Sequence, residues 1–409
     1  MEQLFNIDLK KISTNSKKEF DERKKNLNLF LESGLPNKKD EDWKFTDLDR
    51  IIKINFDKLT NFTEKKNFKT QFRLKFDHYS VYTLNGYLVD YFEDFPFNLN
   101  RCESSQISHK SISKTNKNSM QTLNSMLTDR GYSIKISKKM DKPIVIYNFF
   151  NKDLNDKMIN SFNSISIENT EATVIEYNFD DSNTSYLKNT YQNIFIKNGT
   201  LNYYFINDRK TQSYNYCNNL SKLNNAELKY YILSSGIKFR KNDNEIYLNG
   251  SKSNCEIYSA SYLKKDEHQE IKTLINHEDP NCKSHQKIKK ILSDNSRGIF
   301  QGKIFVNERA QKTNAYQLSN ALILNDAAEF NAKPELEIYA DDVKCSHGSS
   351  SGNLDKDAIY YLMARGIKKG DAIQLLVKGF LSEIIETIKL NYLKEVVEEH
   401  IEKSTLYEN

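Results

Sequence analysis

Residues 333–348 read KPELEIYADDVKCSHG, and they mark the boundary between a β-rich region and a helical one. Alternate positions within residues 336–340 are apolar, which is the period-2 pattern of a half-buried strand. If the extended backbone continues to the end of the segment, Cys345 and His347 share one face, because alternate side chains of a strand point the same way. The segment therefore predicts β structure that ends with a thiol close to an imidazole.

Short apolar runs recur upstream of this segment, and many of them are followed by a turn residue. The candidate turn residues are Asn169, Asn198, Asn225, Gly250, Asn276, Asn307 and Asp326. Their successive spacings are 29, 27, 25, 26, 31 and 19 residues, by subtraction of the residue numbers. A loose period of this size without intervening helices is typical of a β-solenoid, in which each coil buries its apolar face against its neighbours. Short strands separated by polar turns also fit a β-sandwich, so the pattern favours the solenoid and leaves the sandwich open.

Helices are predicted on both sides of the β-rich region. Residues 17–32 form one helix, and Trp43, the only tryptophan, is expected to anchor the segment that follows. Asp355 can cap a helix after the β region, and residues 373–388 carry a wide apolar stripe in which we expect Phe380 to be buried. We divide the chain into an N-terminal helical and mixed region (1–100), a connecting segment (101–140), a β core (141–350) and a C-terminal helical domain (351–409).

Composition excludes several classes of protein. The 409 residues include 60 basic and 55 acidic ones, and the resulting charge of +5 gives little support for a nucleic-acid surface. No apolar run approaches the roughly 20 residues that span a bilayer, and the N-terminus lacks the apolar core of a signal peptide. The five cysteines are scattered and include no Cys-x-x-Cys pair. We therefore expect a cytoplasmic protein without disulfides and without a nucleic-acid or membrane partner.

The chain lacks the usual catalytic signatures, and two thiol–imidazole groupings remain. It contains no GxxxxGK[ST], GxGxxG, GxSxG or HExxH motif. Cys282 and His285 lie in a polar turn, where a complete zinc site would need four ligands, so a structural role is favoured. Cys345 and His347 suit iron in a cluster, but two ligands are too few, and others would have to come from a partner chain or a thiol. The alternative for this pair is a buried cysteine next to a hydrogen-bonded histidine.

Several long motifs resemble the SufB/SufD family of iron–sulfur cluster assembly proteins, and specifically its SufD branch. They are GKIFV (302–306), the segment 333–348 quoted above, DAIYYLMARGI (357–367) and, more weakly, EDWKFT (41–46). The resemblance implies a right-handed parallel β-helix core flanked by helical regions. It also implies a non-catalytic scaffold subunit that pairs with a SufB-like paralogue and docks a SufC-like ABC-type ATPase.

The resemblance assigns roles to particular residues and suggests cofactors. His347 and Cys345 would lie at the interface with the paralogue, where a nascent cluster or iron is held, and Tyr360, Tyr361 and Arg365 would contact the ATPase. The complex would carry a transient iron–sulfur cluster or iron and could bind reduced flavin, whereas the isolated chain should bind nothing tightly and could form a homodimer. Two other classes stay open, namely a β-helix carbohydrate-active enzyme and a stand-alone metal-binding protein.

Overall fold

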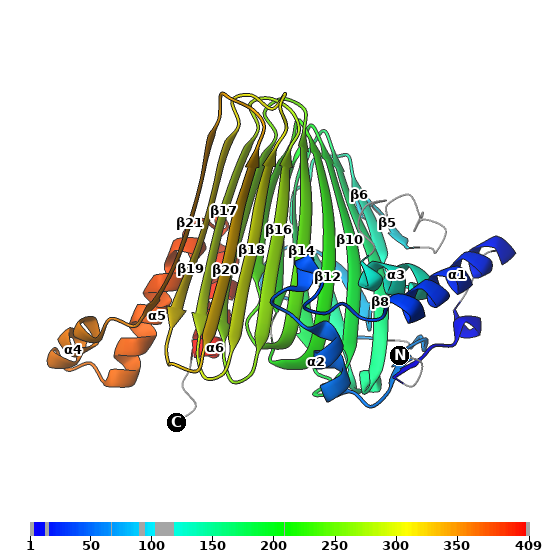
Figure 1. The fold of residues 1–409 in the computed structure, drawn as a ribbon, viewed down its shortest axis with the longest axis horizontal. Helices are drawn as coiled ribbons and strands as arrows, with labels where there is room; N and C mark the ends of the chain where they lie inside the picture. The colour runs from blue at the N-terminus through cyan, green and yellow to red at the C-terminus, as the bar shows by residue number, and fades with distance from the viewer. Residues whose placement is uncertain are drawn as a thin grey trace.

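The protein folds as two stacked sets of parallel strands with helices on either side (Figure 1). The computed structural model describes residues 4–12, 16–66, 68–89, 95–102, 118–207 and 209–405. Within these residues, strand pairing is parallel except for two short antiparallel pairs near the N-terminus. The predicted mainly β fold with helical flanks is confirmed.

The first sheet contains eleven strands among the described residues. In order across the sheet, nine of them are β1 (Phe5–Asn6), β2 (Leu59–Asn61), β8 (Lys157–Glu168), β10 (Leu187–Lys197), β12 (Thr211–Asn224), β14 (Ile237–Asn249), β16 (His268–His277), β18 (Arg297–Val306) and β20 (Glu329–Ile338). The other two, β5 (Asn98–Arg101) and β6 (Tyr132–Ile136), pair with each other, and β6 also pairs with β8.

The second sheet contains ten strands in the described part of the chain. Their order is β21 (Lys344–Asn353), β19 (Asn314–Ile323), β17 (Lys283–Leu292), β15 (Asn254–Leu263), β13 (Glu227–Leu233), β11 (Thr200–Asn207), β9 (Glu171–Asp180), β7 (Ile144–Phe150), β3 (Tyr79–Leu84) and β4 (Tyr87–Leu88). From β7 to β21 the chain alternates between the sheets, so each coil contributes one strand to each. This arrangement is a parallel β-solenoid and not a sandwich.

The register of the first sheet gives the length of each coil. Paired residues along β10, β12, β14, β16 and β18 are Leu187, Tyr214, Phe239, His268 and Arg297, which are 27, 25, 29 and 29 residues apart by subtraction. These spacings agree with the loose period of the turn residues. The prediction of stacked coils is therefore confirmed, because strands one period apart are hydrogen-bonded neighbours.

The turn prediction was correct at six of the seven candidate residues and wrong at Asn276. Gly250, Asn307 and Asp326 lie in connections between strands, as do Asn169, Asn198 and Asn225. Asn169, Asn198 and Asn225 have φ values of 54°, 49° and 49°, the left-handed region that asparagine tolerates better than most residues. Asn276 lies inside β16 instead, and Asn281, with φ of 61°, occupies the corresponding turn. Both asparagines lie in a stretch of mixed apolar and polar residues, so the sequence alone did not distinguish a strand position from a turn.

The space between the sheets has an apolar half and a polar half. Near the asparagine turns, Leu223 and Leu248 are paired and fully buried. Because inner positions recur every second residue, Asn215 and Arg240 face the same interior at the other end of these strands. The sequence pattern did not reveal this polar half.

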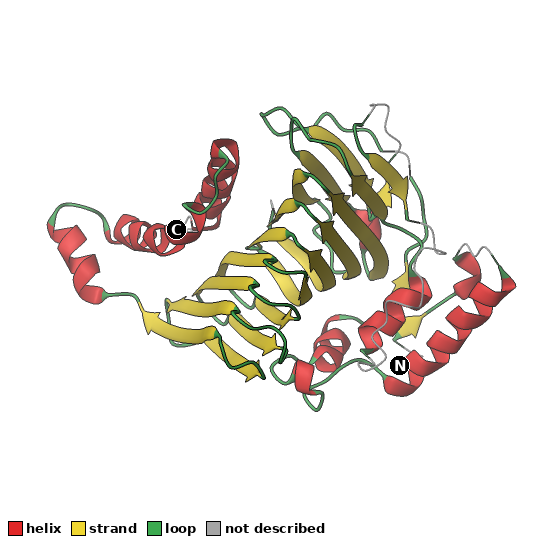
Figure 2. Cartoon of the chain, turned by 90° about the horizontal axis from the view of Figure 1, so that it is seen from above, coloured by secondary structure: helices red, strands yellow, loops and turns green. Residues whose placement is uncertain are grey.

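Helices cover both outer faces (Figure 2). They are α1 (Lys17–Ser33), α2 (Leu48–Asn55) and α3 (Ser119–Leu127) on the N-terminal side and α4 (Lys356–Ala364), α5 (Lys369–Ile385) and α6 (Asn391–Thr405) on the C-terminal side. The first three share an apolar cluster with the first sheet, whereas α5 and α6 pack on the second. In the described part of the chain, no helix is long and apolar enough to cross a lipid bilayer.

The region expected to connect the N-terminal part to the β core contains regular structure. Within 101–140, the described residues form α3 and β6, while residues 103–117 lie outside the described part of the chain. The first hundred residues also contribute strands to the solenoid, because β2 pairs with β8 and β3 pairs with β7.

Candidate functional site

The last coil of the solenoid has a neighbouring coil on one side only among the described residues. β20 pairs only with β18, and β21 pairs only with β19, so each strand has one free edge. Every residue of these two strands is at least partly exposed, whereas β18 and β19 bury several. Pro334, which has no N–H group, lies in β20, as expected of an edge strand. The coil therefore presents both strand edges and part of its inner face.

Cys345 and His347 lie in this last coil. They belong to β21 and not to a continuation of the strand that contains residues 336–338, because β20 ends at Ile338 and a turn precedes Lys344. Their register partners in β19 are Ala315 and Gln317, which are both buried. Being two residues apart on one strand, the thiol and the imidazole project to the same side.

The two side chains have different environments. Cys345 is half-buried and packs against the apolar cluster that includes Ile304, Val306 and Ala315. This burial raises the pKa of its thiol, although a backbone hydrogen bond from Ala315 acts in the opposite direction. His347 is exposed. The arrangement pairs a largely protonated thiol with an accessible imidazole that can bind a metal.

The polar sequence of β21 is held in place by β19. The strand reads KCSHGSSSGN, a composition that does not favour strands. Ten consecutive residues nevertheless pair with β19, and side chains add cross-strand hydrogen bonds. Ser319 Oγ donates to Ser349 Oγ over 3.0 Å, and Asn320 Nδ2 donates to Ser350 Oγ over 2.7 Å. Pairing with the backbone of β19, and not the strand propensity of its own residues, therefore specifies β21.

Tyr360, Tyr361 and Arg365 lie on α4 and at its C-terminal end, beyond the solenoid. Asp355 caps α4 as predicted, by accepting hydrogen bonds from the backbone N–H groups of residues 357 and 358. The helix buries none of its residues, and 66% of Tyr360 and 57% of Tyr361 are exposed. The Arg365 guanidinium lies 4.3 Å from the centroid of the Tyr361 ring. The structure thus brings these three residues together on one exposed helix, separate from the strand that carries Cys345.

Helix α5 packs against the second sheet through ion pairs and apolar contacts. Glu383 lies 2.5 Å from Lys287 Nζ and 2.7 Å from Lys289 Nζ. Leu381 and Ile384 are buried against this sheet. Phe380, which we expected in the core, is only partly buried, and the Lys289 ammonium lies 4.5 Å from the centroid of its ring.

Cys282 and His285 lie on opposite faces of the second sheet. Cys282 is fully buried in the interior, and its thiol donates to the carbonyl oxygen of Gly250 over 3.3 Å. His285 is on the outer face, where its ring stacks on Tyr316 with centroids 5.4 Å apart. Within the described residues, no group of three or more His, Cys, Asp and Glu side chains is arranged to hold a metal ion.

Sequence reasoning missed a buried charged cluster beneath the EDWKFT segment. Lys241 and Glu270 are fully buried and form an ion pair on the outer face of the first sheet. Lys241 also donates to the carbonyl oxygen of Asp42 over 3.0 Å, and Thr46 donates to Glu270. Trp43 is 3% exposed, which confirms its predicted anchoring role. The partners are 199 and 224 residues apart in the sequence, so no local pattern pointed to them.

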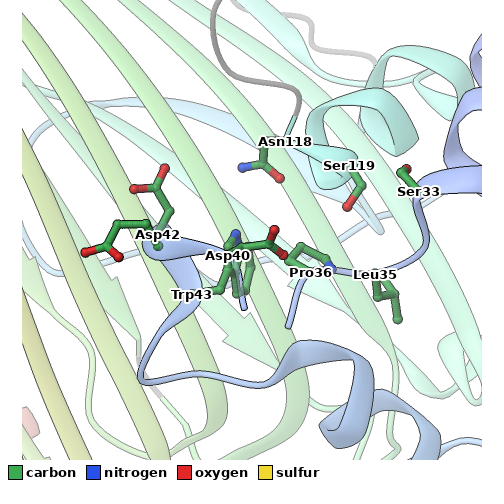
Figure 3. A pocket seen from close by; sticks show the side chains of 9 residues that line it. Ser33, Leu35, Pro36, Asp40, Asp42, Trp43, Asn118 and Ser119 are labelled. Carbon is green, nitrogen blue, oxygen red and sulfur yellow. The ribbon is translucent and has the colours of Figure 1, made fainter. Parts of the chain in front are cut away.

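A pocket of about 300 Å³ opens beside this segment (Figure 3). Its lining includes Asp40, Glu41 and Asp42 from the N-terminal segment and Asn118 and Ser119 at the start of α3. Glu41 and Asp42 already pair with Lys333 and Lys272, and the lining itself contains no Lys or Arg that could pair with the phosphate of a flavin nucleotide. The pocket therefore does not fit the reduced flavin that the resemblance suggested.

Comparison with known proteins identifies the family. The family model described as "SUF system FeS cluster assembly, SufBD core domain" matches residues 152–380, which contain the solenoid strands from β8 to β21, α4 and most of α5. The chain belongs to the SufBD family. It is 27% identical to the iron–sulfur cluster assembly protein SufD of Escherichia coli over 383 residues, which cover 91% of this chain and 89% of that protein.

Other relatives agree with this assignment. A SufBD family iron–sulfur cluster assembly protein of Synechocystis is 26% identical over 390 residues, covering 88% of this chain and 85% of that protein. The SufD protein of Bacillus subtilis is 35% identical over 113 residues, or 28% of this chain and 26% of that protein. The SufD branch that the motifs predicted is confirmed, and with it a role in iron–sulfur cluster assembly.

Proposed function

We propose that this SufBD chain is a non-catalytic scaffold subunit of a cytoplasmic SUF complex. It pairs with a SufB-like paralogue, docks a SufC-like ABC-type ATPase and helps to hold iron or a nascent cluster at the interface between the two solenoids. The observation that carries the proposal is the uncovered last coil, because β20 and β21 present free edges next to Cys345 and His347.

The free edges support pairing with a second solenoid. An unpaired strand edge offers a row of N–H and C=O groups to any chain with a matching edge. A paralogue with the same architecture can supply strands of similar length in both sheets at once, and this would bury the last coil of each chain. The same edges explain why the isolated chain could form a homodimer.

Cys345 and His347 supply two of the ligands that an iron or a cluster would need. Binding to iron removes the thiol proton, and the raised pKa of Cys345 makes this removal harder until metal is present. His347 adds an exposed imidazole, a common metal ligand, on the same side of β21. Because two ligands are insufficient, the partner would contribute the remainder, so the cargo is held only in the assembled complex.

Helix α4 supports the docking of the ATPase. It exposes Tyr360 and Tyr361 beside Arg365, and Tyr and Arg are residue types enriched at protein interfaces. Helix α5 follows α4 and forms an ion pair with β17 through Glu383. Movement of an ATPase docked on α4 would therefore be transmitted to β17, which is separated from β21 and Cys345 by β19 alone.

Co-purification tests the proposal. The chain is tagged and expressed with the SufB-like and SufC-like proteins of its own organism, and the eluted proteins are identified. We expect a three-component complex for the wild type, loss of the ATPase alone for a Tyr360→Ser, Tyr361→Ser variant, and an intact complex with less bound iron for His347→Ala. A wild-type chain that elutes alone would overturn the proposal, and loss of the whole complex in His347→Ala would make His347 structural instead.

A further inference from the structure

A buried arginine in the solenoid interior has no hydrogen-bond acceptor and no ion-pair partner among the described residues. Arg240 is 3% exposed and lies on the inner face of β14. Its guanidinium carbon is 3.7 Å from the centroid of the Phe205 ring. Within the described part of the chain it makes no hydrogen bond and no ion pair, and its Nε is enclosed without an acceptor. A guanidinium carries five N–H donors and a permanent charge, so this environment is strongly unfavourable as it stands.

Another buried arginine of the same chain shows what a satisfied site looks like. Arg23 of α1 is 2% exposed, and it forms an ion pair with Glu19 at 3.1 Å. It also donates to the carbonyl oxygens of Met126 and Thr128 over 2.5 and 2.9 Å. The protein therefore supplies acceptors to one enclosed guanidinium and none to the other. An external acceptor at Arg240 would account for the difference.

Two lysines and several buried carboxylates share this part of the solenoid interior with Arg240. Lys188 lies two strands away in the same inner row and donates only to Asn178 Oδ1, over 3.3 Å. Burial chiefly lowers the pKa of Lys188, and burial lowers that of Lys290 to about 7, with the charge of Arg240 acting in the same direction in both cases. The nearby buried carboxylates already accept hydrogen bonds, Glu176 from Tyr203 and Asn148 and Asp180 from Tyr186 and Thr211.

The neighbouring amide is also incompletely satisfied. Asn215 stands between Lys188 and Arg240 in the inner row, and its Oδ1 is buried without a hydrogen-bond donor. The oxygen and nitrogen of an amide exchange places on a flip of the side chain, so Asn215 can turn an N–H group toward the same space. Lys188, Asn215 and Arg240 thus stand side by side in one inner row, as two cationic side chains and one amide that can turn a donor toward them.

We propose that the solenoid interior binds a small inorganic anion of halide size against the Arg240 guanidinium, with Lys188 and Asn215 as further donors. The anion is expected to be small, because side chains already occupy much of the space around the guanidinium. The Phe205 ring covers one face, and Gln269 of β16 is the register neighbour of Arg240 in the inner row. The site is separate from Cys345 and His347, and it does not depend on the partners proposed above.

Anomalous scattering from bromide tests the site directly. Crystals of the full chain are soaked in sodium bromide, and a peak is expected within hydrogen-bonding distance of the Arg240 guanidinium. Bromide ions on the protein surface provide an internal control for the soak. The proposal is wrong if bromide appears only on the surface, or if ordered water occupies the space beside Arg240.

A solution experiment separates the site from general salt effects. Thermal unfolding is followed while bromide replaces the bulky anion gluconate at constant ionic strength. The wild-type melting temperature should rise and saturate with bromide, because a ligand that binds only the folded state stabilises it. Arg240→Met should lose this rise, and Arg297→Met, a change at an exposed arginine paired with Glu329, should keep it. An equal rise in all three proteins overturns the proposal, and if Arg240→Met fails to fold, the bromide peak in wild-type crystals decides.

Discussion

Gly302 illustrates how closely the solenoid interior is packed at the level of single residues. A Cβ atom at this position would lie 2.5 Å from Gln317 Oε1 and 2.6 Å from Cζ of Phe300. We therefore expect Gly302→Ala to lower the free energy of unfolding by ~1–3 kcal/mol in urea denaturation, the usual effect of overpacking a core. Gly352→Ala on β21 is the matched control, because a Cβ atom added there would meet no other atom within 4 Å. Equal stability of the two variants would contradict this account of Gly302.

His277 makes the stability depend on pH. The side chain is fully buried, its Nε2 is 2.9 Å from Ser284 Oγ, and its Nδ1 has no hydrogen-bond partner. Burial lowers its pKa from 6.5 to about 4. The unfolded chain therefore binds a proton more readily, and the stability contributed by the neutral imidazole is complete above pH 6.5 and is lost as the pH falls through about 4.

Urea denaturation of the wild type and of His277→Gln between about pH 7.5 and about pH 4.5 checks this prediction. Stability of the wild type should fall more steeply toward low pH, by up to about 3 kcal/mol relative to the variant, since each unit of pKa shift corresponds to about 1.4 kcal/mol. The comparison is needed because carboxylates titrate in the same range in both proteins. Parallel curves would show that His277 is not buried in its neutral form.

At the level of whole elements, the sequence was informative where a local rule applied and uninformative where pairing decided the structure. Helix α1 and the cap of α4 follow from local signals and were predicted. Extended structure was predicted as far as His347, as a continuation of the preceding strand. β21 was not recognised as a separate strand running on to Asn353, because its serine-rich sequence has low strand propensity and is held by pairing with β19. For the candidate site, the proximity of Cys345 and His347 followed from their spacing in the sequence. The exposure of the last coil did not, because it arises from the absence of a further coil beside β20 and β21 among the described residues.

Leu381 tests how α5 is attached to the second sheet. It is 1% exposed and belongs to the same apolar cluster as Tyr231 and Tyr258. Leu381→Ala should destabilise the C-terminal domain by ~2–5 kcal/mol, the range for truncating a buried leucine. Thermal unfolding and limited proteolysis of α5 would report the loss. Leu375→Ala on the same helix is the control, because Leu375 is 54% exposed and its truncation should have little effect.

The solenoid is a stack of coils, and its two ends differ in whether further strands continue the two sheets. At the N-terminal end, β2 and β6 continue the first sheet beyond β8, and β3 and β4 continue the second sheet beyond β7. At the C-terminal end, β20 and β21 have no such continuation among the described residues. Because each coil of a solenoid contacts only its neighbours, the uncovered end is the natural place for a second chain to extend the stack.

Hydrogen exchange should reveal this asymmetry and the proposed interface in one experiment. In the isolated chain, backbone amides of β12, β14 and β16 have neighbours on both sides and should exchange most slowly, whereas those of β20 and β21 should exchange faster. Addition of the SufB-like partner should slow exchange in β20 and β21 by about tenfold or more, since coverage worth about 1.4 kcal/mol already has that effect. The central strands serve as the internal control, because their neighbours do not change on pairing. If the partner instead protected α1 or the outer face of the first sheet and left β21 unchanged, the two chains would associate in another way, and Cys345 and His347 would lie outside their interface.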